Sequence, residues 1–171
     1  MQVVCDITPV ETGDPGIGLL LAVLDDTTNE WRKYLGDVPD EALNWRPFPG
    51  GHTIGGLILH IADVEAHWLH EVAAGVVRDP EELATLLTEE TQQGAVQWPD
   101  VPEKPLSWFF AQHGIIRRRT VQIVLGLESL TAIGRRDDEE FTLRWLLNHV
   151  ISHEAYHGGQ AVLLNLMRER M

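Results

Sequence analysis

The sequence predicts an all-α protein in which four long helices form a bundle. Four segments of the 171 residues carry apolar side chains at helical spacing, and capping residues, glycine or proline bound them. No segment alternates apolar and polar residues for long, so we expect strands only in a short hairpin near residues 133–141. Four amphipathic helices in a chain of this length bury their apolar faces against one another, which predicts a single helical-bundle domain over residues 1–171.

The first two helices are expected over residues 16–36 and 53–74. The apolar side chains near one face of the first are Leu20, Leu21, Leu24, Trp31 and Leu35. The second begins at Thr53, whose hydroxyl suits the N-cap position, and it ends at Gly75, a residue type that commonly terminates helices.

The other two long helices are expected over residues 106–125 and 142–168. The third follows Pro105, and the fourth has Thr142 as its N-cap and arginines in its last turn, where the helix dipole favours positive charge. An acidic linker, residues 78–104, separates the second and third helices. We expect a short extra helix over residues 80–91 in this linker, followed by an extended stretch at residues 98–102.

The net charge of −13 argues against nucleic acid and against an anionic membrane surface as partners. The basic residues form two islands, residues 117–119 and 135–136. Three consecutive arginines on a helix point in three directions, so we interpret the first island as a solvated surface.

Targeting and redox features are sparse. No apolar run approaches the ~20 residues of a membrane span, and the N-terminus lacks a basic region followed by a long apolar stretch, so we expect a cytoplasmic protein. Cys5 is the single cysteine, which excludes a disulfide within the chain and a zinc cluster of thiolates.

The spacing of the histidines indicates a metal site. His149, His153 and His157 follow one another at intervals of four on the fourth helix, and each such step drifts only ~40° around the axis. One ion can bridge a single step of this kind, so the pair is either 149 with 153 or 153 with 157. His60 lies in an apolar turn of the second helix, where an imidazole needs a polar partner, and it is the candidate third ligand.

The remaining histidines are expected to have other roles. His67 lies ~10 Å beyond His60 along the helix axis, too far for one ion to bind both. His67 and His70 are expected near acidic residues and solvent, and His52 in the approach to the second helix. His113 has no obvious partner in its own segment, so we expect it to be structural or exposed.

Residues 153–157 also match the His-Glu-x-x-His motif of zinc metalloproteases. No histidine follows His157, and Gln160 and Leu163 stand where the extended motif requires glycine and a third histidine. Glu154 is rotated away from both histidines, so we expect it to face solvent or a neighbouring helix and not to act as a base. Gln160 lies close to the histidine stripe and suits a hydrogen bond to a ligand or a helix contact.

Two blocks of the sequence resemble the DinB/YfiT-like family of metal-binding proteins. The first is LNWRPFPG (residues 43–50) with TIGGLILHIA (53–62), and the second is TLRWLLNHVISHEAYHGGQ (142–160). The resemblance implies a four-helix bundle of DinB/YfiT type that holds one divalent transition metal, zinc or nickel, through His60, His153 and His157. Relatives often carry arginine after the last ligand. This chain has Gly158 there, so an anion contact by that arginine is not carried over.

The resemblance also implies a function. Some members of the family transfer bacillithiol, mycothiol or glutathione, and a related branch isomerises maleylpyruvate with a thiol. Three imidazoles leave coordination positions open, as catalytic metal sites do. We therefore expect a metal-dependent transferase of a low-molecular-weight thiol onto small electrophiles, and a homodimer packed through helices. The alternatives are a non-catalytic metal-binding stress-response module and a metal-assisted hydrolase.

Three expectations concern the surroundings of the last ligand. His149 is expected to be buried, or to lie beside the ligands without binding the metal. Tyr156 is expected in the core, and Gly158 and Gly159 are expected to leave free space for substrate beside the helix.

Overall fold

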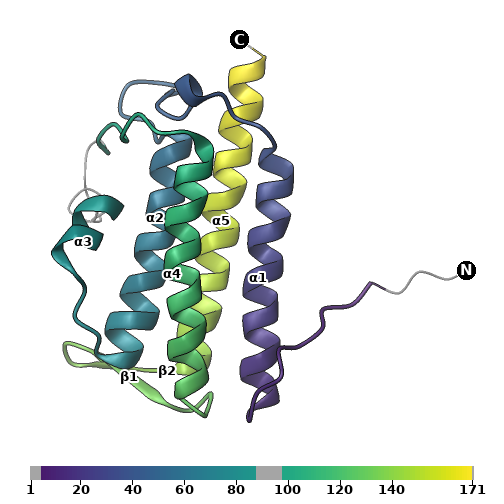
Figure 1. The fold of residues 1–171 in the computed structure, drawn as a ribbon, viewed down its shortest axis with the longest axis vertical. Helices are drawn as coiled ribbons and strands as arrows, with labels where there is room; N and C mark the ends of the chain where they lie inside the picture. The colour runs from purple at the N-terminus through teal and green to yellow at the C-terminus, as the bar shows by residue number, and fades with distance from the viewer. Residues whose placement is uncertain (1–4, 88–97, 171) are drawn as a thin grey trace, which may run out of the picture.

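The computed structural model describes residues 5–87 and 98–170 of the chain. Its four long helices are α1 (Pro15–Leu35), α2 (Ile54–Ala66), α4 (Leu106–Gly126) and α5 (Leu143–Glu169). They stand side by side along the long axis of the molecule (Figure 1). Helix α2 packs against α4 and α5, and α5 packs also against α1. The predicted all-α bundle is confirmed.

The predicted helix ends lie within a residue or two of the observed ones because the capping residues act as expected. Thr53 Oγ1 accepts the amide hydrogen of Gly56 at 3.0 Å, and Thr142 Oγ1 accepts that of Trp145 at 3.3 Å. Asp14 caps α1 in the same way. The predicted apolar face of α1 is buried at Leu21, Leu24, Trp31 and Leu35, and Leu20 is half-buried.

Helix α2 continues into a π-helical segment, η2 (His67–Val72), and the helical conformation ends before Gly75, which has a φ of +66°. The extent of the second helix was therefore predicted, but the π turn was not. A π turn contains more residues than an α turn, so side chains beyond residue 66 depart from the face expected at ~100° per residue. His70, expected near solvent, is fully buried, and its Nε2 lies 2.9 Å from Thr120 Oγ1.

Short elements connect the long helices. The turn η1 (Asp40–Ala42) precedes α2, and α3 (Pro80–Leu86) lies beside the bundle (Figure 1). The extra linker helix is confirmed up to Leu86; the remainder of its predicted range, from residue 88 onward, falls outside the described residues. The predicted hairpin is formed by β1 (Ile133–Arg136) and β2 (Glu139–Thr142), which pair antiparallel.

Across the two described ranges, no helix combines the length and apolar character needed to cross a membrane.

A polar layer separates two hydrophobic clusters in the core. One cluster includes Trp31, Leu35, Leu57, Ile61, Phe109 and Ala161. The other includes Ile17, Leu21, Leu24, Leu69, Val124 and Leu147. The polar layer consists of Thr28, Glu65, His113, Arg117 and Glu154, which lie between the two clusters along their helices. A buried layer of this kind is tolerated only when its charges and hydrogen-bonding groups are paired.

Candidate metal centre

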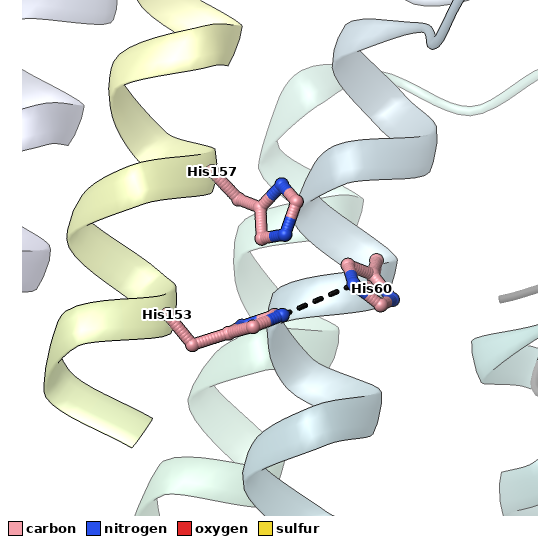
Figure 2. Close-up of side chains that lie close together, drawn as sticks. All are labelled: His60, His153 and His157. Carbon is pink, nitrogen blue, oxygen red and sulfur yellow. Dashed lines mark hydrogen bonds between the residues drawn. The ribbon is translucent and has the colours of Figure 1, made fainter. Parts of the chain in front are cut away.

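Three histidines from two helices meet between α2 and α5. His60 belongs to α2, and His153 and His157 lie one turn apart on α5. The side chains of His153 and His157 point toward His60 (Figure 2). The Nε2 atoms of His153 and His60 are 3.1 Å apart, and one ring nitrogen from each of the three residues lies within 4.8 Å of the other two. The structure thus brings together the three histidines singled out from the sequence.

Their spacing fits a divalent transition metal. Nitrogens bound to one tetrahedral zinc ion at about 2.1 Å are roughly 3.4 Å apart, close to the observed separation of the two Nε2 atoms. The donor set contains only imidazoles, which suit zinc and nickel. Three protein ligands also leave positions open for a small molecule.

Burial keeps these imidazoles neutral, the form that can donate a lone pair to a metal. Desolvation, together with the smaller effect of the neighbouring imidazoles, lowers the pKa of His60 from 6.5 to about 4 and that of His153 to about 2. Desolvation also lowers the pKa of His157. At neutral pH these imidazoles are therefore unprotonated, so protons do not compete with a metal for their nitrogen atoms.

Gln160 fixes the tautomer of His157. Its Oε1 lies 2.7 Å from His157 Nδ1, and because an amide oxygen only accepts hydrogen bonds, Nδ1–H is the donor. The lone pair of His157 is then on Nε2, on the other side of the ring. Of the two roles considered for Gln160, a hydrogen bond to a histidine of the stripe or a helix contact, the hydrogen bond is present.

Aromatic rings flank the three histidines. The Trp98 ring lies 4.7 Å from the His60 ring and 3.9 Å from that of His52, between centroids. On the other side, His149 is half-buried and stacks on Trp145 with a centroid distance of 4.8 Å and an interplanar angle of 8°. His149 therefore lies beside the three-histidine group and outside it, as expected.

His67 also lies outside the group. Its Nδ1 is 2.7 Å from Glu71 Oε2, which agrees with the expectation that it sits near acidic residues.

A second group with metal-binding side chains lies in the polar layer, but an arginine already neutralises it. Glu65, His113 and Glu154 each place one ligand atom within 4.8 Å of the others. The Arg117 guanidinium contacts both carboxylates, at 2.9 Å for Glu65 and 2.6 Å for Glu154. A cation bound there would have to displace this guanidinium or suffer its repulsion, so we interpret the group as an ion-pair network.

The polar layer overturns one prediction. Arg117 is mostly buried, with its side chain 12% exposed, and it pairs with Glu65 and Glu154 instead of forming a solvated surface with its neighbours. His113, expected to be structural or exposed, is buried and structural, and its hydrogen-bonding partners lie on other helices. Arg32 donates to His113 Nδ1 at 2.8 Å, so Nε2–H of His113 faces Glu65 Oε2 at 3.3 Å.

Charge pairing decides the protonation of this layer. Burial raises the pKa of Glu65, but Arg117 and His113 outweigh burial and hold the pKa well below its ordinary value. Burial lowers the pKa of Arg117, yet Glu65 and Glu154 raise it above its ordinary value. Glu65 and Arg117 are therefore both charged at neutral pH.

Glu154 faces away from the histidines, which excludes the metalloprotease role for it. It is 1% exposed and accepts hydrogen bonds from Thr28 Oγ1 at 2.6 Å and Trp31 Nε1 at 2.8 Å, in addition to Arg117. Of the two surroundings expected for Glu154, solvent or a neighbouring helix, the structure shows the second.

Two predictions about α5 near His157 are wrong. Tyr156 is 63% exposed and not in the core. Gly158 is buried against Trp31 of α1, because it lies one turn after Glu154 on the side that faces α1; a Cβ there would fall 2.5 Å from Trp31 Cγ. Of these two glycines, Gly159 is the one with open space beside it.

Comparison with known proteins gives one family. The family model described as MST, mycothiol-S-transferase, matches residues 19–171, a range that contains all four long helices apart from the first turn of α1. No curated protein matches the chain.

Proposed function

The chain belongs to the mycothiol-S-transferase family, within the DinB/YfiT-like superfamily, and from this premise we propose that it is a metal-dependent transferase of a mycothiol-type thiol onto small electrophiles. The observation that carries the proposal is the convergence of His60, His153 and His157 on one point between α2 and α5. His60, His153 and His157 would hold one zinc or nickel ion per chain.

The residues of the chain would hold the ion and leave room for the cosubstrate. A divalent ion bound by three imidazoles would supply open coordination and lower the pKa of a thiol that reaches it. Gln160 would keep the His157 lone pair directed to the ion, and burial would keep the ligands neutral. In the transfer, the thiol loses its proton to water and sulfur forms a bond to an electrophilic carbon. With an aryl halide the halide departs with its electron pair; with an epoxide or an α,β-unsaturated carbonyl the electron pair of the broken C–O or C=C π bond takes up a proton from water.

The sulfur would come from a diffusible cosubstrate. Cys5 is exposed and precedes α1 in the sequence, and no other cysteine is present in the chain. A mycothiol-type thiol is the cosubstrate that the family assignment favours over bacillithiol and glutathione.

The test is a conjugation assay on metal-loaded protein. Mycothiol, bacillithiol and glutathione are each incubated with an activated aryl halide, an epoxide and an α,β-unsaturated carbonyl, and conjugates are identified by mass spectrometry. We expect mycothiol conjugates to form faster than without protein, and the rate to disappear in His157→Ala. Metal-loaded protein that accelerates none of these reactions would favour the non-catalytic metal-binding module. Water-derived products would favour the hydrolase.

A homodimer packed through helices is part of the proposal. It is supported by the family resemblance and by apolar side chains exposed along α5, including Tyr156, Leu163 and Leu166. Sedimentation equilibrium should give twice the chain mass, and a monomer at high concentration would remove this part of the proposal.

A further inference from the structure

We propose that Arg117 and Glu154 are positioning residues that hold α2 and α5 in the relative placement at which His60, His153 and His157 can bind one ion. The inference rests on the proposed metal site. It concerns side chains that would touch neither the metal nor a substrate, because they lie in the polar layer between the helices and are only 12% and 1% exposed.

One guanidinium, that of Arg117, links its own helix α4 to the three other long helices. Arg117, on α4, donates from Nε and Nη2 to the two carboxylate oxygens of Glu65 on α2, both at 2.9 Å. Its Nη2 also donates to Glu154 of α5 at 2.6 Å, and its Nη1 donates to Thr28 Oγ1 of α1 at 2.8 Å. The planar, forked geometry of arginine makes such contacts directional, so the guanidinium fixes orientation as well as distance.

The two carboxylates lie close in sequence to the metal-binding histidines. Glu154 directly follows His153, and Glu65 is about 7.5 Å further along the axis of α2 than His60. One ligand comes from α2 and two come from α5, so the relative position of these helices decides whether three nitrogens meet at one point. The Arg117 contacts tie the same two helices together.

Both carboxylates of the network are held by several donors, so they can keep one geometry before any ion binds, although Arg32 Nε is buried without a hydrogen-bond partner among the described residues. Glu154 receives three donors, from Thr28, Trp31 and Arg117. Arg32 bonds to His113, whose other ring nitrogen faces Glu65. A buried network in which the members satisfy one another is rigid, and rigid support is what preorganises a metal site.

A network that only stabilises the fold would make a different prediction, and metal affinity separates the two. Glu154→Gln retains an oxygen that can accept from Thr28 and Trp31 but removes the charge opposite Arg117. The matched control is Asn165→Ala, which removes another buried hydrogen bond between α5 and α1, from Asn165 Nδ2 to the Leu35 carbonyl oxygen at 3.1 Å. Asn165 lies two turns beyond His157 and outside the polar layer.

The measurement is the Co²⁺ dissociation constant, from competition with a chelator, together with the visible absorption spectrum of the Co²⁺ form. We expect Glu154→Gln to weaken binding about 10–100-fold, as loss of groups that support ligands does, and to change the spectrum. Asn165→Ala should lower the melting temperature and leave both metal readouts unchanged. Arg117→Lys, which keeps the charge and loses the fork, should weaken binding in the same direction as Glu154→Gln.

Trp31→Phe provides a second variant in case Glu154→Gln fails to fold, since it keeps the charge of Glu154 and removes the indole N–H that donates to it, along with part of the buried ring. It should weaken Co²⁺ binding by a smaller factor. Variants that melt earlier but bind Co²⁺ with unchanged affinity and spectrum would overturn the inference. Wild-type protein that binds no Co²⁺ would instead overturn the metal site on which the inference rests.

Discussion

His157 Nδ1 lies 2.7 Å from Gln160 Oε1, three residues further along α5. This hydrogen bond leaves the lone pair of His157 on Nε2 and restricts rotation of the ring. Both effects would be lost in Gln160→Ala, in which the ring can rotate and change tautomer. We expect this variant to bind zinc about 10–100-fold more weakly by chelator competition. Gln160→Glu keeps an acceptor oxygen and should retain most of the affinity. Equal affinity of Gln160→Ala and wild type would show that the contact plays no part in metal binding.

A second prediction separates His149 from His157. The His149 ring stacks on Trp145 and lies 6.3 Å from the His153 ring, between centroids. His149→Ala should therefore weaken metal binding modestly, by ~10–100-fold at most. His157→Ala removes one of three ligands and should cost far more, as measured by isothermal titration of the metal-free proteins. The opposite order would move the metal one turn toward the start of α5.

A third prediction uses adjacent glycines of α5. In Gly158→Ala the new methyl group would lie within 2.8 Å of three Trp31 atoms, so the variant should lose about 1–2 kcal/mol of unfolding free energy despite the better helix propensity of alanine. Gly159→Ala meets nothing within 4 Å and should gain roughly 0.5–1 kcal/mol. Urea unfolding of both variants measures these changes, and equal stability of the two would contradict the packing described for Gly158.

A fourth prediction concerns acid. The pKa of His60 is about 4 in the folded protein against 6.5 ordinarily, so between these values the unfolded chain binds a proton that the folded chain does not. The stabilising contribution of the neutral, buried His60 is therefore fully present above pH 6.5 and is lost as the pH falls toward 4. The low pKa of Glu65 acts in the same direction at lower pH, below the ordinary value of 4.5.

Chelator-treated protein should accordingly melt at lower temperature at pH 5 than at pH 7.5. His60→Asn cannot titrate at this position and should show a shallower dependence on pH. A melting temperature that is the same at both pH values in the wild type would show that the burial of His60 has no such effect.

The sequence predicted the fold and the three-histidine group because both depend on local patterns. Helical spacing of apolar residues placed the four helices, and the interval between His153 and His157 indicated a chelating pair. His60 was recognisable as an imidazole in an apolar turn that needs a partner, and the partner proved to be His153. The family resemblance then selected 153 with 157 over 149 with 153.

The parts that were not predicted depend on contacts between distant segments. Arg117 looks like its exposed neighbours in the sequence, and only the packing of α1, α2 and α5 around it reveals two buried carboxylates as partners. His70 is buried because the π turn redirects the side chains after residue 66. The close approach of Trp31 to Gly158 likewise cannot be predicted from either helix alone.

The metal content of the purified protein decides whether His60, His153 and His157 form a metal site. Protein prepared without chelators is analysed by mass spectrometry of the elements, beside a His153→Ala/His157→Ala double variant whose helical content is checked by circular dichroism. We expect close to one zinc or nickel ion per chain in the wild type, by the donor preferences of imidazole, and none in the double variant. A folded double variant that retained the full metal content would contradict the site formed by His60, His153 and His157.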